Sequence, residues 1–253
     1  MMKNLDWPLP FWIAHRGAGK LAPENTLAAF RIGAQHGYRA FECDVKLSRD
    51  GQPFLLHDDK LNRTTRERGI AGERDWAELS RIDAGAWHSR AFAGETLPSL
   101  DAIARFCLGN GHALNLEIKP TTGQELLTGQ VVGREVLRLW QGAAAFPLLS
   151  SFKPEALVGA AETAPEVPRA LLLDALKPGW LDQARGLGCI GVVANYTLMD
   201  ASMIEQIHAA GMKAAVYTVN DPASAQWLIS HGIDGIITDA VDRFSPAQAA
   251  IRA

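Results

Sequence analysis

The chain has 253 residues, of which 47% are hydrophobic and 21% are charged, and its formal net charge is -3. This composition is typical of a folded globular protein and excludes collagen-like, low-complexity and intrinsically disordered classes. The slight negative charge gives no basic surface for nucleic acid, so any anion must bind at a local site. A single α/β barrel needs about 250 residues, and the length therefore favours one large domain.

The N-terminal segment predicts neither a signal peptide nor a membrane anchor. Residues 1–12 contain one lysine and no apolar core of the signal-peptide kind, and no apolar run approaches the roughly 18 residues of a membrane span. The three cysteines, Cys43, Cys107 and Cys189, form an odd and scattered set, which indicates buried free thiols. We therefore expect a cytoplasmic protein with no membrane partner.

Short apolar runs that favour β-strands alternate with helical segments along the whole chain. Eight runs are predicted as strands: 11–15, 39–45, 113–119, 147–152, 169–173, 190–195, 213–219 and 235–239. Three helical segments carry capping residues at the start, near Asn25 and Thr26, at Asp200, and at Asn220 and Asp221, and stop at Gly37, Gly211 and Gly232. Alternation of this kind implies a parallel sheet with helices outside, and eight repeats in this length predict an α/β fold, the closed (β/α)8 or TIM barrel.

One apolar run, residues 52–58, does not fit the alternation. It follows the second predicted strand after a tight-turn signal at Asp50 and Gly51. A parallel crossover needs a dozen or more residues, so we expect this run to return antiparallel as a hairpin arm. Folding about the turn brings His57 beside Asp44.

Residues 59–97, which follow the hairpin arm, are rich in charge and glycine, and one short helix is expected over 75–82. A loop of this length is usually functional or a small subdomain, and a purely structural insertion that covers the barrel mouth is the open alternative. No linker divides the chain. We predict one domain over residues 1–253, with an insertion at about 59–97 over the barrel mouth.

Polar side chains end several predicted strands, where the βα loops begin and where active sites of these barrels lie. They are His15 and Arg16, Glu42 and Asp44, His57 and Asp58, and Glu117 and Lys119. Because side chains alternate along a strand, Glu42 and Asp44 point the same way. Glu117 and Lys119 also share one side of their strand. Three carboxylates are therefore expected to face one lumen.

Three carboxylates in a barrel mouth are costly unless each charge has a partner. Structural salt bridges to Arg16 and Lys119 are one interpretation, but two bases cannot neutralise three acids. A hard divalent cation removes the excess charge, and carboxylate oxygens are the ligands that Mg²⁺ or Ca²⁺ prefers. No close histidine pair or suitable cysteine indicates zinc. The cluster of Glu42, Asp44 and Glu117 is therefore predicted to bind Mg²⁺ or Ca²⁺.

His15 and His57 flank these carboxylates at the expected catalytic end. A lone strand histidine is more often a packing residue, but two histidines that titrate near neutral pH can act as general base and general acid. Arg16 and Lys119 supply cations suited to a phosphoryl group. The combination predicts metal-assisted cleavage of a phosphodiester.

The chain resembles the glycerophosphodiester phosphodiesterase family in segments that span nearly its whole length. The matching segments are 14–30 (AHRGAGKLAPENTLAAF), 42–65 (ECDVKLSRDGQPFLLHDDKLNRTT), 82–87, 97–103, 114–119, 150–152, 216–220 and 234–239. The resemblance implies a (β/α)8 barrel with a small insertion, an acid/base role for His15 and His57, metal binding by Glu42, Asp44 and Glu117, and phosphate binding by Arg16 and Lys119. Asn25 either lies at the mouth near the phosphate or only caps a helix.

The resemblance further implies hydrolysis of a small glycerophosphodiester to sn-glycerol 3-phosphate and an alcohol. Two departures are visible: Tyr217 stands where family members usually have tryptophan, and residues 66–68 stand where they have a glycine-rich turn. The alternatives are a relative acting on lysophospholipids or phosphoinositides, and a phosphodiester-binding barrel without turnover. The preferred alcohol, the choice between Mg²⁺ and Ca²⁺, and the oligomeric state are not fixed by the sequence.

Overall fold

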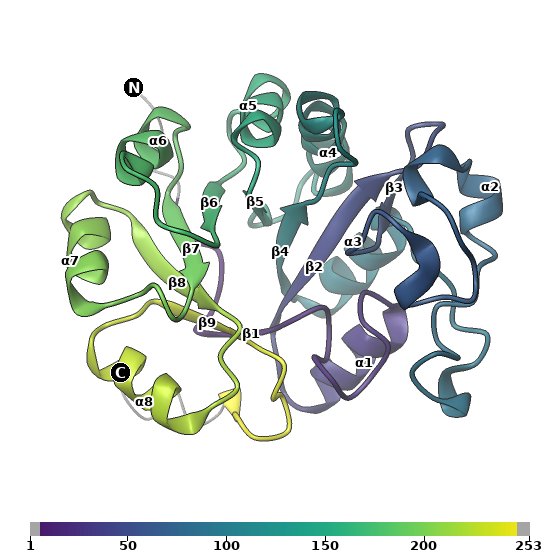
Figure 1. Cartoon of the computed structure of the whole chain (residues 1–253), viewed down its shortest axis with the longest axis horizontal. Helices are drawn as coiled ribbons and strands as arrows, with labels where there is room; N and C mark the ends of the chain where they lie inside the picture. The colour runs from purple at the N-terminus through teal and green to yellow at the C-terminus, as the bar shows by residue number, and fades with distance from the viewer. Residues whose placement is uncertain (1–5, 247–253) are drawn as a thin grey trace.

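Eight parallel strands close into a barrel in the computed structural model, which describes residues 6–246. Closure is made by β1, which pairs in parallel with β2 on one side and with β9 on the other (Figure 1). The barrel strands are β1 (Trp12–Ala14), β2 (Ala40–Leu47), β4 (Ala113–Ile118), β5 (Leu148–Ser151), β6 (Arg169–Leu173), β7 (Gly191–Asn195), β8 (Lys213–Tyr217) and β9 (Gly235–Thr238). The predicted (β/α)8 barrel is confirmed.

Helices follow the barrel strands and lie around the outside of the barrel, apart from α2, which lies in the segment after β3 (Figure 1). They are α1 (Leu27–Gln35), α2 (Trp76–Leu79), α3 (Leu100–Asn110), α4 (Glu125–Leu139), α5 (Pro154–Thr163), α6 (Trp180–Gly186), α7 (Ala201–Ala209) and α8 (Pro222–Ser230). Thr26, Asp200 and Asp221 cap α1, α7 and α8, since each side chain accepts a hydrogen bond from a backbone N–H three residues later. Each of these three helices ends two residues before its predicted glycine.

Alternation of side chains along the strands divides the core into two layers. Residues of one face, such as Phe41 and Leu116, pack against the helices, whereas Ile13, Leu172 and Val193 fill the barrel lumen. The lumen is therefore apolar at its floor. Polar side chains that include Glu42, Asn115 and Glu117 line the cavity at the other end of the barrel, so a polar site lies above an apolar base.

The hairpin arm is confirmed as strand β3 (Pro53–Leu55), which pairs antiparallel with β2. The backbone N–H of Leu56 donates to the Asp44 carbonyl at 3.1 Å, so Leu56 lies opposite Asp44 and His57 comes one residue later. The side chain of His57 thereby reaches Lys119 of the neighbouring strand end, with 2.9 Å between Nε2 and Nζ.

The segment 59–97 lies on one side of the barrel beside β3 (blue in Figure 1) and has a small apolar core of its own. The helix expected over 75–82 is shorter, because the chain turns after Leu79 and then forms an antiparallel bridge between Asp83 and Thr96. Three 3-10 helices complete the segment, at Leu61–Arg63, Ala71–Glu73 and Arg90–Phe92.

The cysteines and the helices can be compared with what the sequence predicts about thiols and membrane spans. The three cysteines are free and buried, as predicted. Within residues 6–246, no helix combines the length and the apolar character that crossing a membrane requires. The cytoplasmic location and the single domain with an insertion over the mouth stay predictions.

Candidate active site

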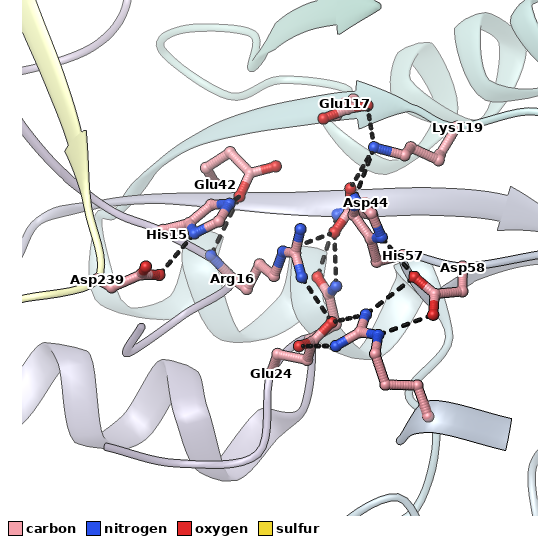
Figure 2. Close-up of polar contacts among 12 residues, drawn as sticks. His15, Arg16, Glu24, Glu42, Asp44, His57, Asp58, Glu117, Lys119 and Asp239 are labelled. Atoms are coloured by element: carbon pink, nitrogen blue, oxygen red, sulfur yellow. Dashed lines mark hydrogen bonds and ion pairs between the residues drawn. The ribbon is translucent and has the colours of Figure 1, made fainter. Parts of the chain in front are cut away.

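A cavity of about 270 Å³ opens at the C-terminal ends of the strands. Six of the residues expected at the site line it, together with an apolar wall from the later strands. The polar lining includes His15, Arg16, Glu42, His57, Glu117 and Lys119, and the apolar wall includes Phe152, Leu172, Tyr217 and Ile237. Figure 2 shows the polar side chains converging from the ends of β1, β2 and β4 and from the chain after β3. The sequence-predicted site is therefore assembled in one place, and Asp44 and Asn25 lie directly behind its lining.

Glu42, Asp44 and Glu117 form the carboxylate cluster that the sequence predicts. One oxygen of each lies within 4.8 Å of the others, and all three side chains are buried. Asp44 and Glu117 occupy paired positions on the adjacent parallel strands β2 and β4. Asp44 Oδ1 is buried and, within the part of the chain that the structure describes, accepts no hydrogen bond, although Lys119 Nζ lies 3.5 Å away. Three carboxylate oxygens this close together, one of which accepts no hydrogen bond, suit the coordination of a hard divalent cation.

The surroundings shift the pKa values of the three carboxylates in different directions. Burial, followed by repulsion from neighbouring acids, raises the pKa of Glu42 well above its usual range and that of Glu117 to about 7. Burial also opposes ionisation of Asp44, but attraction by Arg16 and Lys119 outweighs it and lowers the pKa of Asp44. A bound cation would oppose the upward shifts, because it favours ionised carboxylates.

The loop after β1 directs two residues toward the carboxylates. Arg16 and Asn25 have left-handed backbone conformations, with φ of 50° and 57°, and strained residues of this kind gather at functional sites. The backbone N–H of Arg16 donates to Glu42 Oε2 at 3.1 Å. Asn25 donates from Nδ2 to Asp44 Oδ2 at 2.7 Å and accepts from the Asp44 backbone N–H at 3.1 Å.

The role of Asn25 is thus more specific than the two alternatives raised by the sequence. The helix cap of α1 is Thr26, not Asn25. Asn25 is 2% exposed, and both ends of its amide contact Asp44. Its position fixes the orientation of a carboxylate, while its predicted contact with phosphate stays a prediction.

Arg16 and Lys119 supply the positive charge of the cavity. Arg16 contacts Glu24 at 2.8 Å through a terminal nitrogen and lies 3.4 Å from Asp44 through Nε. Lys119 Nζ lies 2.7 Å from Glu117 and 3.5 Å from Asp44. Although burial disfavours both cations, the carboxylates, led by Asp44, raise their pKa values, so both side chains are charged at neutral pH.

His15 is oriented by a residue that the sequence analysis left without a role. Its Nδ1 lies 2.7 Å from Asp239 Oδ1, at the end of β9, and Asn220 donates to the other oxygen of Asp239 at 3.1 Å. Gly19 permits this approach, because a side chain there would collide with the Asp239 backbone. A carboxylate on Nδ1 leaves Nε2 as the free nitrogen, and Nε2 lies 3.8 Å from Glu42.

His57 has an equivalent arrangement on the other side of the cavity. Its Nδ1 lies 2.6 Å from Asp58 Oδ1, and its Nε2 lies 2.9 Å from Lys119 Nζ. Burial is the largest cause that lowers the pKa of His57, and the cations Arg16 and Lys119 add to the effect. Asp58, by contrast, is held ionised because hydrogen bonds from Arg63 lower its pKa.

Lys46 is a second residue that the sequence analysis missed, although alternation from Glu42 and Asp44 places it on the same face of β2. It is 1% exposed, and its Nζ lies 2.7 Å from Asp59 Oδ1. It also donates to the carbonyl oxygens of Lys119 at 3.0 Å and His57 at 3.5 Å. A buried ammonium therefore joins the backbone at two site residues.

The substitution Lys46→Met is expected to lower the free energy of unfolding by about 1–3 kcal/mol, because two carbonyl oxygens lose a donor that water replaces poorly in a buried position. Urea denaturation followed by circular dichroism measures the change. Lys213→Met is the matched control: Lys213 binds Asp234 at 2.7 Å but is half exposed, so a loss below about 1 kcal/mol is expected. An equal decrease in the free energy of unfolding in the two variants would show that the buried contacts of Lys46 stabilise the protein no more than an exposed ion pair does.

Comparison with known proteins shows which family this sequence resembles. The model of the glycerophosphoryl diester phosphodiesterase family matches residues 15–243. YhdW of Bacillus subtilis, provisionally named as such an enzyme, is 32% identical over 91% of this chain and 94% of its own. A glycerophosphodiester phosphodiesterase from Caldanaerobacter subterraneus is 30% identical over 90% of this chain and 93% of its own.

A solved structure has the same fold over nearly the whole length. It is a phosphodiesterase from Oleispira antarctica in complex with the product sn-glycerol-3-phosphate. The sequence identity is 35%, the TM-score is 0.88, and the match covers 97% of this chain and 98% of that chain. The fold of the barrel and the family thus agree across both kinds of comparison.

Proposed function

The chain belongs to the glycerophosphoryl diester phosphodiesterase family, and we propose that it hydrolyses a small glycerophosphodiester to sn-glycerol 3-phosphate and an alcohol with two histidines and a divalent cation. The observation that supports this most strongly is the convergence of His15, His57, Arg16, Lys119 and the carboxylate cluster on one cavity of about 270 Å³. The Oleispira antarctica phosphodiesterase was solved in complex with sn-glycerol-3-phosphate, which is the product that this proposal assigns.

Arg16 and Lys119 bind the phosphate in this proposal. A guanidinium offers a planar fork of donors to phosphoryl oxygens, and an ammonium offers a compact point charge. Both groups border the cavity, and neighbouring carboxylates keep both ionised. The diester is thereby anchored with its reacting phosphorus between the two histidines.

His15 acts as the general base. Asp239 accepts the hydrogen bond from Nδ1–H, so Nε2 is left unprotonated on the cavity side. Nε2 takes the proton of the glycerol 2-hydroxyl, and the hydroxyl oxygen forms a bond to phosphorus. The bond from phosphorus to the alcohol oxygen breaks, which leaves a cyclic glycerophosphate.

His57 acts as the general acid. Asp58 holds Nδ1, and Nε2, which accepts a hydrogen bond from Lys119 in the free protein, becomes available when Lys119 turns to the phosphate. Protonated Nε2 then gives its proton to the departing alcohol oxygen. Burial lowers the pKa of His57, whereas the carboxylates of Asp44 and Asp58 act in the opposite direction and favour its protonated form. Water then opens the cyclic phosphate to sn-glycerol 3-phosphate, and the two histidines exchange their roles in this second half.

Glu42, Asp44 and Glu117 hold the divalent cation, and their all-oxygen donor set suits Mg²⁺ or Ca²⁺. When bound there, the cation would neutralise charge on a phosphoryl oxygen and assist loss of the hydroxyl proton. Asn25 keeps Asp44 turned toward this position through its two hydrogen bonds.

The test of this proposal is hydrolysis of glycerophosphocholine by the purified protein with Mg²⁺ or Ca²⁺, followed as release of sn-glycerol 3-phosphate. Two comparison substrates sharpen it. An analogue without the 2-hydroxyl should not turn over, and its cleavage at the same rate would replace the cyclic path by direct attack of water. Faster cleavage of lysophosphatidylcholine than of glycerophosphocholine would contradict a small water-soluble substrate.

A further inference from the structure

Arg63 joins two carboxylates from different segments of the chain, one after β1 and one after β3. It ends the 3-10 helix Leu61–Arg63 in the segment that follows β3. Its NH1 and NH2 donate to the two oxygens of Glu24 at 2.6 and 2.7 Å. Its Nε and NH2 donate to the two oxygens of Asp58 at 2.7 and 3.0 Å. All three nitrogens of the guanidinium are therefore engaged, and both carboxylates are held in bidentate fashion.

Each of these carboxylates also holds a group of the active site. Glu24, in the loop after β1, accepts a hydrogen bond from Arg16 at 2.8 Å. Asp58 lies 2.6 Å from Nδ1 of His57. Arg63 is thus the common partner of the residue that orients the phosphate-binding Arg16 and of the residue that orients the general acid.

We propose that Arg63 is a positioning residue, which sets the relative positions of Arg16 and His57 by holding Glu24 and Asp58. The inference rests on the proposed function, because it concerns the same site. Arg63 itself does not line the cavity. It therefore acts through its two partners and not by contact with the phosphodiester.

The geometry distinguishes this contact from an ordinary surface ion pair. Arg63 is 43% exposed, but Glu24 is only 12% exposed and is held at the same time by Arg16 and Arg63. The fork of an arginine fixes two carboxylates in direction as well as distance, which the single nitrogen of lysine cannot do. The clamp formed by Glu24, Arg63 and Asp58 joins the loop after β1 to the segment after β3.

Loss of the clamp should affect substrate binding and proton transfer together. Arg16 would lose the fixed position of Glu24, which weakens its alignment on the phosphate. His57 would lose the fixed position of Asp58, which weakens its alignment on the departing oxygen. Misplacement of reacting groups by about 1 Å can lower a rate about 100-fold, even when the substituted residue is remote from the chemistry.

The test compares Arg63→Met and Arg63→Lys with a matched control, Arg49→Met. Arg49 makes the same bidentate contact to Asp75, with 2.8 and 2.6 Å, but neither residue lines the cavity. With glycerophosphocholine, kcat/KM should fall about 10- to 100-fold in both Arg63 variants, through kcat and KM together. The control should keep wild-type values, and far-UV circular dichroism should show both Arg63→Met and Arg49→Met folded at the assay temperature.

Two further measurements separate positioning from charge and from fold. Wild-type kcat and KM in Arg63→Lys would contradict the proposed positioning role, because a positive charge alone would then be enough for full activity. In an Asp58→Asn background, Arg63→Met should cost less in kcat than it does in the wild type, and an undiminished cost would also overturn it. Calorimetric binding of sn-glycerol 3-phosphate needs no turnover: Arg63→Met should bind about 10-fold more weakly than Arg49→Met. If the wild type fails to hydrolyse the substrate, the proposed function fails, and this binding comparison still decides the role of Arg63.

Discussion

Replacement of either His15 or His57 by alanine should lower kcat for glycerophosphocholine about 10²- to 10⁴-fold, the usual range for removal of a general acid or base. Both imidazoles have Nδ1 held by a carboxylate, from Asp239 and Asp58 respectively, so each presents only Nε2 for proton transfer. Steady-state assays at pH 7 with the metal in excess measure the loss. Far-UV circular dichroism should show an intact barrel in both variants.

A substrate with a better leaving group separates the two histidine roles. With glycerophospho-p-nitrophenol the departing phenolate needs no proton, so His57→Ala should regain much of its activity, whereas His15→Ala should not. The reverse result would exchange base and acid between the two residues. His36→Ala is the control, because His36 is exposed at the end of α1 and lies outside the cavity. Nearly unchanged turnover in either His15→Ala or His57→Ala would refute the acid/base pair altogether.

The barrel was predictable because its signals are local and periodic. Each strand is a short apolar run next to a turn residue, and the capping side chains of Thr26, Asp200 and Asp221 lie where the helices begin. Alternation alone placed Glu42 and Asp44 on one face of β2. The parallel pairing of Asp44 with Glu117 then brings the carboxylates of two strands together, as expected from strand ends that meet at one edge.

The contacts that orient the site were not predictable in the same way. His15 and Asp239 are 224 residues apart in the chain, and their hydrogen bond depends on the loop around Gly19 as well as on the closure of β1 against β9. The contact of Lys46 with the Lys119 carbonyl depends on the length of a flexible side chain. Residue type and spacing indicate which groups reach the mouth, but they do not specify which partner each group binds.

The structure of the segment 59–97 also depends on contacts that its sequence alone does not specify. Its composition indicated an insertion, but its apolar residues pack with Phe54 into a separate small core, and the expected helix is cut to four residues at Trp76–Leu79. Arg63 was not singled out, because an arginine in a charged loop carries no signal until Glu24 and Asp58 are placed on either side of it. Long-range pairing, and not local propensity, gives this residue its role.

Removal of divalent cations should abolish most of the activity. Neutralisation of transition-state charge by a bound metal ion contributes several kcal/mol, so treatment with EDTA should lower kcat by at least about 10²-fold. Add-back of Mg²⁺ or Ca²⁺ should restore the rate, and the more effective ion identifies the cofactor. Glu117→Gln should require much more metal for half-maximal rate, while Glu155→Gln, at the first turn of α5, should behave as the wild type. Full turnover in EDTA would refute the carboxylate–metal interpretation.

The metal-free protein should also show a characteristic dependence of stability on pH. Burial and the neighbouring Asp44 raise the pKa of Glu117 to about 7, above the value of about 4.3 that glutamate has in an unfolded chain. The folded state then binds more protons than the unfolded state between these values, so the free energy of unfolding falls as pH rises through about 7. Melting temperatures in EDTA between pH 5 and 8.5 should decline in the wild type and change less in Glu117→Gln. A divalent cation, which binds the ionised carboxylates, should remove most of the decline; an equal decline with and without metal would place the titrating group elsewhere.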